Sequence, residues 1–312
     1  MELGTPWKMH SKPYCHLQGR NRILPVQLAG HRKRHPKEEQ RPTCYNLQLV
    51  VASVKKVAVS NDSRLPSFKP LSCTFNGGYA VSQAETDKFT SWDEEALVLK
   101  RKADALIPEL KGKCIFLVGM MGSGKTTVGK ILSEALGYYF FDSDRLVEEA
   151  AGGMSVAQIF QDHNEQCFRD SESEVLKQLS TMYRLVVATG GGAVVRPQNW
   201  SYMRQGITVW LDVPVEALAE RVVAVGTESR PLLGQASGDR YSEAFSRLSK
   251  LYEDRAEAYS NSDVRVSLKK IASKLGYNNV SPLTPTIIAI ETLKEISDLR
   301  RDRKLMNGAA GA

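Results

Sequence analysis

The sequence predicts an α/β protein of the three-layer α/β/α type, with helices on both faces of a central parallel sheet of about five strands. Short apolar runs, each suited to a buried strand, alternate with segments whose apolar residues recur at helical spacing. The first run, Cys114 to Val118, leads into a glycine-rich loop and then into a helical pattern. Ligands of such sheets bind where strands end, so the segments that follow the apolar runs are the candidate sites.

Residues 119–127 read Gly-Met-Met-Gly-Ser-Gly-Lys-Thr-Thr and match the phosphate-binding motif G-x-x-x-x-G-K-[ST]. Glycines let backbone N–H groups wrap a phosphate, and the following helix N-terminus adds partial positive charge. The alternative is a plain strand-to-helix turn. The motif predicts a nucleoside triphosphate, with Mg²⁺ on the Thr126 hydroxyl. The expected nucleotide-binding residues are Gly122, Ser123, Gly124, Lys125, Thr126 and Thr127.

A helix is predicted ahead of this loop. Residues 91–94 read Ser-Trp-Asp-Glu, a capping box that marks the start of a helix ending at Leu110. It is expected to pack on the sheet. Its predicted apolar side carries Leu97, Leu99, Ala103, Leu106 and Ile107.

Strands and helices alternate in short steps from the loop onward. The helix after the loop carries Val128, Leu132 and Leu136 on one side, and Gly137 is its predicted stop. Short apolar runs predict the strands, and helical spacing predicts the helices between them. In chain order we expect strand 114–118, helix 125–136, strand 139–141, helices 144–151, 155–162 and 165–181, strands 185–189 and 207–212, helix 214–225, a loop at 226–240, helix 241–259, strand 264–268 and helix 284–300.

Residues 1–85 differ from the rest of the chain. They show no sustained periodicity and contain seven prolines, and residues 1–80 carry 13 Lys and Arg against 4 Asp and Glu. A basic, acid-poor segment without a secretory apolar core predicts an organelle transit peptide, with cleavage near residues 60–85. The alternatives are a disordered tail without an address and a nucleic-acid-binding arm around residues 31–35. The predicted division is leader 1–85, folded domain 90–300 with its core at 113–268, and flexible tail 301–312.

Charge and histidine content exclude several classes of function for the folded part. Residues 81–312 carry 29 Lys and Arg against 31 Asp and Glu, a net charge of −2, which offers no basic face for nucleic acid. His163 is their only histidine, which leaves little basis for a zinc site or a Ser/His/Asp triad. No run of about 18 apolar residues is present, so we expect no membrane span.

Two further strand ends carry polar or glycine-rich segments. Asp142 is placed to hold the water shell of Mg²⁺, and Asp144 to accept a hydroxyl proton as general base; the alternative is that either aspartate caps the next helix. Gly190-Gly191-Gly192 costs backbone entropy, which indicates close approach of a ligand to bare backbone; the alternative is a tight turn.

Three arginines add positive charge. Arg169 can grip a carboxylate, although a surface pair with Glu165 or Glu172 is the alternative. Arg230 lies in a Gly-, Ser- and Thr-rich segment that predicts a mobile lid, where it can close over the transferred phosphoryl group, and Arg255 lies on the helix that follows. Either of these alone is more often an ordinary solvated side chain. Together they predict a small anionic acceptor beside ATP.

From about Lys113 to Leu268 the chain resembles the shikimate kinase family of nucleoside-monophosphate-kinase-like P-loop proteins. With its leader and C-terminal helix, it is similar to the plant plastid form, which implies that the leader is a transit peptide to the chloroplast. The resemblance rests on an ordered set of motifs: Gly119 to Thr127, Phe141 to Asp144, Phe168-Arg169, Gly190 to Gly192, Arg230 to Leu233, and Arg255 with Tyr259.

The resemblance implies transfer of the ATP γ-phosphoryl group to the 3-hydroxyl of shikimate, with Mg²⁺, on the route to chorismate and aromatic amino acids, by a monomer or weak homodimer. Two alternatives stay open: a non-catalytic binding or regulatory relative, and a P-loop kinase for another small acid. The implied roles are catalysis by Lys125, Asp144 and Arg230; shikimate binding by Asp144, Arg169, Gly191, Gly192 and Arg255; Mg²⁺ binding by Thr126 and Asp142; and ATP binding by the loop with Arg230 as lid arginine.

Overall fold

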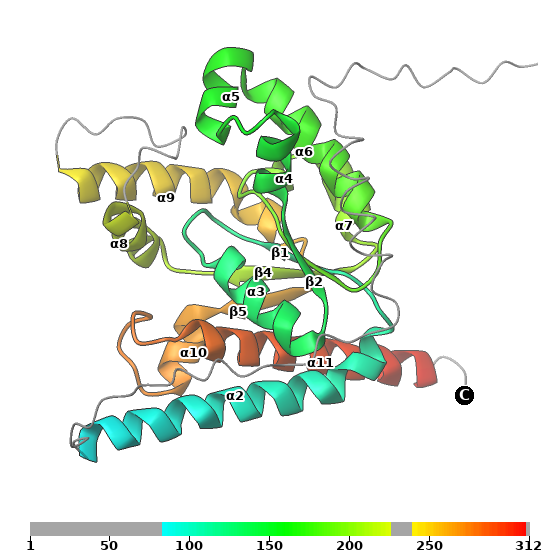
Figure 1. Cartoon of the computed structure of the whole chain (residues 1–312), viewed down its shortest axis with the longest axis vertical. Coiled ribbons are helices and arrows are strands. Elements are labelled where there is room, and N and C mark those ends of the chain that lie inside the picture. Colours follow the sequence, from blue (N-terminus) through cyan, green and yellow to red (C-terminus); the bar gives the residue numbers. More distant parts are fainter. Residues whose placement is uncertain (1–82, 226–238, 310–312) are drawn as a thin grey trace, which may run out of the picture. The chain divides into compact units, whose positions relative to one another are not determined.

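The computed structural model describes residues 83–225 and 239–309 (Figure 1). Within them, five strands form one sheet in the order β2-β3-β1-β4-β5, and all four pairings are parallel. The predicted five-stranded parallel sheet is confirmed. The strands are β1 (Ile115–Val118), β2 (Tyr139–Asp142), β3 (Leu185–Ala188), β4 (Ile207–Asp212) and β5 (Val264–Ser267).

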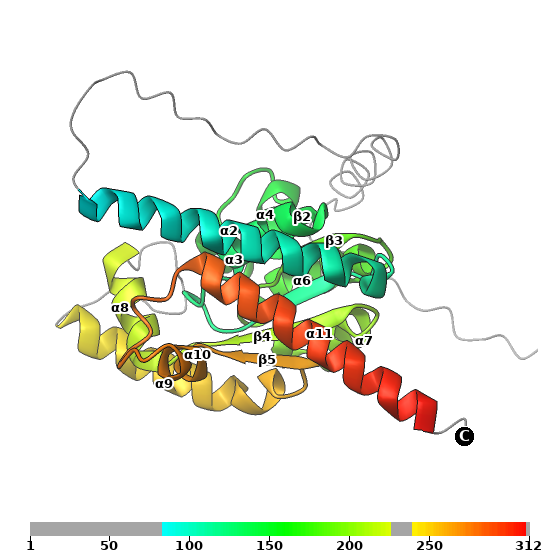
Figure 2. The same cartoon turned by 90° about the horizontal axis from the view of Figure 1, so that it is seen from below.

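Helices cover both faces of this sheet. Figure 1 and Figure 2 show α3 and α11 on one face with α2 outside them, and α9 on the opposite face. The helices are α2 (Gln83–Leu110), α3 (Lys125–Leu136), α4 (Ser143–Ala150), α5 (Val156–His163), α6 (Glu165–Ser180), the 3₁₀ turn η1 (Ala193–Val195), α7 (Pro197–Met203), α8 (Val215–Val225), α9 (Arg240–Tyr259), α10 (Leu268–Lys274) and α11 (Pro285–Ala309).

The three inner strands form the centre of the core. Every residue of β1, β3 and β4 is buried, because helices lie over both sides of them. The edge strands β2 and β5 are only partly buried. This is why the inner strands appear in the sequence as continuous apolar runs rather than as alternating patterns.

The predicted start of the first helix is wrong. Helix α2 begins at Gln83, eight residues before Ser91. Its predicted apolar side is correct only in part, because Ala103 and Leu106 are buried with Leu110, whereas Leu97 is 59 % exposed and Ile107 is 37 % exposed. Residues 103, 106 and 110 follow helical spacing and share one face, and Leu97 falls outside that face.

The last helix is longer than predicted. Helix α11 continues past residue 300 to Ala309, so most of the segment 301–312, predicted to be a flexible tail, is helical. Three short elements, η1, α7 and α10, were not predicted. In contrast, α3 has the predicted bounds and ends at Gly137, which adopts the left-handed conformation.

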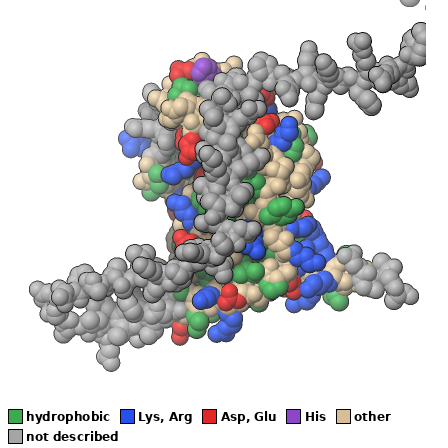
Figure 3. Space-filling model, turned by 45° about the vertical axis from the view of Figure 1, so that its right-hand side comes forward, with side chains coloured by type: hydrophobic (Ala, Val, Ile, Leu, Met, Phe, Trp, Pro, Cys, Tyr) green, Lys and Arg blue, Asp and Glu red, His purple; other side chains and the backbone are tan. Residues whose placement is uncertain are grey.

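Some predictions fall on residues that the structure does not describe. The leader up to residue 82 and the lid segment 226–238, with Arg230, lie outside the described residues. Within the described ones, no helix is long and apolar enough to cross a membrane. On the face shown in Figure 3, basic and acidic side chains occur together, and near the end of α11 Arg301 pairs with Asp298 and Lys304 pairs with Glu109.

Candidate active site

The glycine-rich loop joins β1 to α3 in a conformation that requires its glycines. A Cβ on Gly119 would lie 2.7 Å from the carbonyl oxygen of Leu211, and Gly122 and Gly124 have φ values of +78° and +90°. Lys125 is 8 % exposed, and its Nζ donates to the carbonyl oxygens of Gly119 and Met120, at 2.8 Å each. The loop therefore holds the lysine ammonium against its own backbone at the start of α3.

A hydroxyl and a carboxylate meet beside this loop. Thr126 Oγ1 donates to Asp142 Oδ2 at 2.8 Å, and Asp142 Oδ1 accepts from the backbone N–H of Asp144 at 3.2 Å. Asp142 thus caps α4, as the alternative interpretation held, and also lies next to the predicted metal ligand Thr126. In the part of the chain that the structure describes, no group of three or more His, Cys, Asp or Glu side chains is arranged to hold a metal ion. A hydroxyl with one carboxylate suits Mg²⁺, which takes few protein oxygens and keeps several waters.

The predicted acceptor residues line one cavity of about 300 Å³. It lies at the ends of β1, β2 and β3, as expected where the carboxyl ends of parallel strands meet. Arg255 reaches it from α9. The lining residues are Met121, Asp142, Asp144, Arg145, Glu148, Val156, Phe160, Phe168, Arg169, Gly190, Gly191, Gly192 and Arg255.

Asp144 has an unusual electrostatic environment. Its pKa is raised to about 7, chiefly by burial and also by the charges of Glu172 and Asp142, while Lys125 and Arg169 oppose the rise. Its buried Oδ1 has no hydrogen-bond partner among the described residues. A carboxyl group with a pKa near neutrality in a cavity is suited to general-base work.

Arg169 is held in place by two glutamates. Its Nη1 donates to Glu172 Oε2 at 2.8 Å, and its Nη2 donates to Glu165 Oε1 at 3.2 Å. The arginine is 8 % exposed and Glu172 is fully buried, so the alternative of a surface pair with Glu172 is wrong. Burial raises the pKa of Glu172 above its ordinary value, while the Arg169 guanidinium opposes the shift. Glu172 was considered from the sequence only as a surface partner, and its buried position was missed.

The glycine triplet is needed for space. None of its residues has a positive φ, but a Cβ on Gly190 would collide with the carboxylates of Asp144 and Glu172, and one on Gly192 would collide with the Arg169 guanidinium. The tight turn given as the alternative is present, since the Ala193 N–H donates to the Gly190 carbonyl oxygen at 3.1 Å. The bare backbone makes room for the protein's own charged side chains, and the approach of a ligand stays a prediction.

The carbonyl oxygen of Gly191 is fixed by two residues of α9. It accepts from Tyr259 Oη at 2.7 Å and from Arg255 Nη1 at 3.2 Å. The Tyr259 ring is fully buried and stacks on Trp210, with ring centroids 5.6 Å apart. This contact explains why Arg255 and Tyr259 are spaced one helical turn apart.

A second cavity, of about 500 Å³, lies on the other side of the glycine-rich loop. It is lined by residues 122–128, by Arg221 and Val225 of α8, and by residues at the start of α11. Arg221 Nη1 donates to the carbonyl oxygen of Gly122 at 3.3 Å, and burial lowers the pKa of this arginine. The sequence analysis did not predict that α8 and α11 line this cavity. The pattern that could have indicated it is Arg221, an arginine in a mostly apolar helical stretch. The α11-side residues are Leu283, Pro285 and Ile288.

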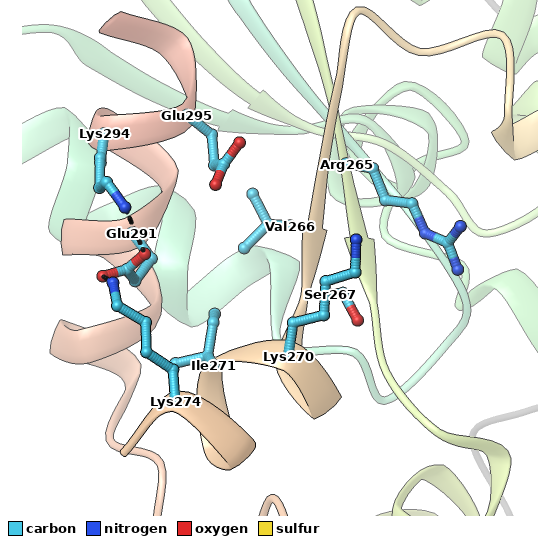
Figure 4. A pocket seen from close by; sticks show the side chains of 9 residues that line it. All are labelled: Arg265, Val266, Ser267, Lys270, Ile271, Lys274, Glu291, Lys294 and Glu295. Carbon is cyan, nitrogen blue, oxygen red and sulfur yellow. Dashed lines mark hydrogen bonds and ion pairs between the residues drawn. The ribbon is translucent and has the colours of Figure 1, made fainter. Parts of the chain in front are cut away.

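A third hollow, of about 200 Å³, lies between β5, α10 and α11 (Figure 4). Lys274 and Lys294 both pair there with Glu291, at 3.1 Å and 3.7 Å. No residue predicted to bind substrate or nucleotide lines it. The Lys274–Glu291 pair joins α10 to α11, whereas the Lys294–Glu291 pair lies within α11.

A family model described as shikimate kinase matches residues 121–288, which is more than half of the chain. The chain belongs to the shikimate kinase family. The resemblance drawn from residues 113–268 is thereby confirmed.

Relatives and solved structures agree with this family. "Shikimate kinase 3, chloroplastic" of Oryza sativa subsp. japonica is 60 % identical over 72 % of this chain and 78 % of the relative. "Probable inactive shikimate kinase like 1, chloroplastic" of Arabidopsis thaliana is 45 % identical over 68 % and 72 %. The solved shikimate kinase from Acinetobacter baumannii in complex with shikimate is 30 % identical, with a TM-score of 0.51, over 65 % of this chain and 99 % of that chain. As its relatives indicate, this shikimate kinase family member is chloroplastic.

Proposed function

We propose that this protein transfers the γ-phosphoryl group of ATP to the 3-hydroxyl of shikimate, giving shikimate 3-phosphate and ADP. The observation that carries the proposal is the acceptor cavity. It combines a carboxylate with a pKa of about 7, Asp144, and two guanidinium groups, Arg169 and Arg255. A hydroxy acid needs both kinds of group, because its hydroxyl must lose a proton and its carboxylate must be bound.

On the acceptor side, the arginines and glycines bind shikimate, and Asp144 acts on its 3-hydroxyl. Glu172 and Glu165 orient Arg169, and the Gly191 carbonyl orients Arg255, so both guanidinium groups are preorganised for a carboxylate. The bare backbone of Gly191 and Gly192 lets the substrate approach closely. Asp144 orients the 3-hydroxyl and accepts its proton.

On the nucleotide side, the glycine-rich loop holds the phosphates. Lys125 binds and stabilises the transferring phosphoryl group, and Arg230 closes over it from the lid. The adenine occupies the cavity between Arg221 and the start of α11. Thr126 and Asp142 would hold Mg²⁺, which would neutralise phosphate charge.

The proposed function includes expectations for the leader and for the oligomeric state. Residues ahead of α2 act as a transit peptide to the chloroplast. We expect its cleavage near residues 60–85, as the sequence predicts. We expect action as a monomer or weak homodimer, as the family resemblance implies.

A catalytically silent relative is the main alternative, since one relative is named as probably inactive. Loss of the acceptor aspartate or arginines would mark such a protein, but here Asp144, Arg169 and Arg255 all line the cavity. The second alternative is a kinase for another small acid, which would share the ATP half of the site.

The test is a coupled ADP-release assay on the purified full chain with shikimate, quinate and gluconate as separate acceptors. We expect ADP release to depend on shikimate. Arg169→Ala should raise the KM for shikimate by about tenfold or more, with a smaller effect on the KM for ATP. Arg247→Ala, on the exposed side of α9, is the matched control. Release with another acid but not with shikimate would support the second alternative.

A further inference from the structure

Helix α2 lies outside the residues that the family model matches and packs along α11 (Figure 2). Glu95 near the middle of α2 contacts Thr284 just before α11, and Glu109 near the C-terminal end of α2 contacts Arg300 and Lys304. The two helices therefore run in the same direction. Their shared core contains buried residues of both: Ala103, Leu106 and Leu110 of α2, and Ile288, Ala289, Leu293 and Ile296 of α11.

Thr284 lies in the chain between two residues that line the cavity of about 500 Å³ beside the glycine-rich loop, here called the nucleotide cavity. The Thr284 hydroxyl donates to Glu95 Oε2 at 3.0 Å and accepts from the backbone N–H of Ile287 at 3.1 Å, so it caps α11 while bound to α2. Its chain neighbours Leu283 and Pro285 line the nucleotide cavity, as does Ile288 one turn later. Glu95 thus fixes the hydroxyl that starts the helix forming this wall.

The contacts at the C-terminal end of α2 are remote from this cavity. Lys304 Nζ donates to Glu109 Oε1 at 2.8 Å, and Arg300 donates to the Glu109 carbonyl oxygen. Sixteen residues of helix separate Arg300 from Thr284, which is about 24 Å at the rise of an α-helix. Variants at these two contacts can therefore distinguish an effect on the cavity wall from an effect on the packing of α2 against α11.

We propose that α2 is a positioning element for nucleotide binding, in which Glu95 acts through Thr284 to fix the apolar wall of Leu283, Pro285 and Ile288. The inference rests on the proposed function only for the nucleotide half of the site. It does not depend on which acid is the acceptor. Glu95 and Thr284 are positioning residues, because neither lines the cavity.

The direct test is calorimetric titration of the full chain with Mg²⁺-ADP. Glu95→Ala removes the acceptor and should weaken ADP binding about fivefold, whereas Glu95→Gln keeps an acceptor oxygen and should restore most of the affinity. Thr284→Val should weaken binding and Thr284→Ser should not. In the pair Glu95→Ala with Thr284→Val, the loss should be no greater than for Thr284→Val alone, because the valine has already removed the shared hydrogen bond.

Lys304→Ala is the matched control at the far end of α2. It should leave ADP affinity unchanged, although it can lower the unfolding temperature slightly. In steady-state assays, Glu95→Ala should raise the KM for ATP and leave the KM for shikimate unchanged. Unaltered ADP affinity in Glu95→Ala, or in Thr284→Val if the first variant does not fold, would overturn the inference, as would an equal loss in Lys304→Ala. ADP binding without turnover on shikimate would contradict the acceptor part of the proposed function and leave this inference standing.

Discussion

Asp144 and Glu172 are two acids facing one small space. Each has one buried oxygen without a hydrogen-bond partner among the described residues, and both oxygens lie where a side chain on Gly190 would have to go. Burial and mutual repulsion favour the protonated form of Asp144, while Arg169 and Lys125 favour its ionised form. The balance leaves a carboxyl group that changes charge near neutral pH.

The first prediction concerns activity. Asp144→Asn should lower kcat by about 10²- to 10⁴-fold, because the amide cannot accept the hydroxyl proton. In the wild type, the ionised carboxylate is the active form, so kcat/KM should rise with pH and level off above about 7. The measurement is ADP release between pH 5.5 and 8.5, with ADP affinity as the control for an intact nucleotide site. A flat profile, or an Asn variant with wild-type rate, would remove Asp144 from the base role.

The second prediction concerns stability. The pKa of Asp144 is higher in the folded protein than its ordinary value of 3.8, so the folded form holds a proton that the unfolded form releases. The contribution of Asp144 to the stability of the wild type is therefore greatest at pH values below 3.8, the pKa in the unfolded chain, and it is lost as the pH rises toward about 7. Asp144→Asn has no such group. Its unfolding temperature relative to the wild type should rise by several degrees from pH 5 to pH 8, and a constant difference would contradict the shifted pKa.

The third prediction concerns the glycine triplet. Gly192→Ala places a methyl group on the Arg169 guanidinium, which Glu165 and Glu172 hold in place. The KM for shikimate should rise about tenfold or more, with ADP affinity unchanged, since the arginine must leave its binding position. Calorimetry with shikimate and with ADP separates the two effects. Normal shikimate affinity in the alanine variant would show that this space is not needed.

At the scale of elements, α3 depends on close contact with the sheet. A Cβ on Gly129 would lie 2.6 Å from Cε2 of Phe140 on β2 and 3.2 Å from Cδ1 of Leu117 on β1. The glycine lets the helix that carries Lys125 and Thr126 approach the strands.

The fourth prediction follows from this contact. In an isolated helix, Gly→Ala stabilises by about 1 kcal/mol, but overpacking a core costs about 1–3 kcal/mol. Gly129→Ala should therefore lower the free energy of unfolding, measured with urea. Lys130→Ala, exposed on the same helix, should change it by less than about 0.5 kcal/mol. A stabilised Gly129→Ala would show that helix propensity outweighs the contact.

Elements with strong local signals were predictable from the sequence. The bounds of α3 follow from Lys-Thr at its start and Gly137 at its end, and the inner strands follow from continuous apolar runs. The seven-residue helices α7 and α10 are too short to show a clear period, so they were missed. The extension of α2 back to Gln83 was missed because Ser91 supplies a capping pattern inside the helix.

At the scale of the whole molecule, the topology brings the site together. Asp142, Asp144 and the glycine triplet were predictable because parallel strands end at one edge of the sheet. Arg221, Glu172 and the α11 wall were not, because their positions depend on packing between elements far apart in the chain. Arg230 stays a prediction, since it lies outside the described residues.

The most direct test of the account is a crystal structure of the full chain with shikimate and ADP. The account predicts the shikimate carboxylate within hydrogen-bonding distance of Arg169 and Arg255, and a ring hydroxyl on Asp144 facing the glycine-rich loop. Shikimate bound outside the cavity at the ends of β1, β2 and β3, or bound with its carboxylate against Asp144, would contradict it.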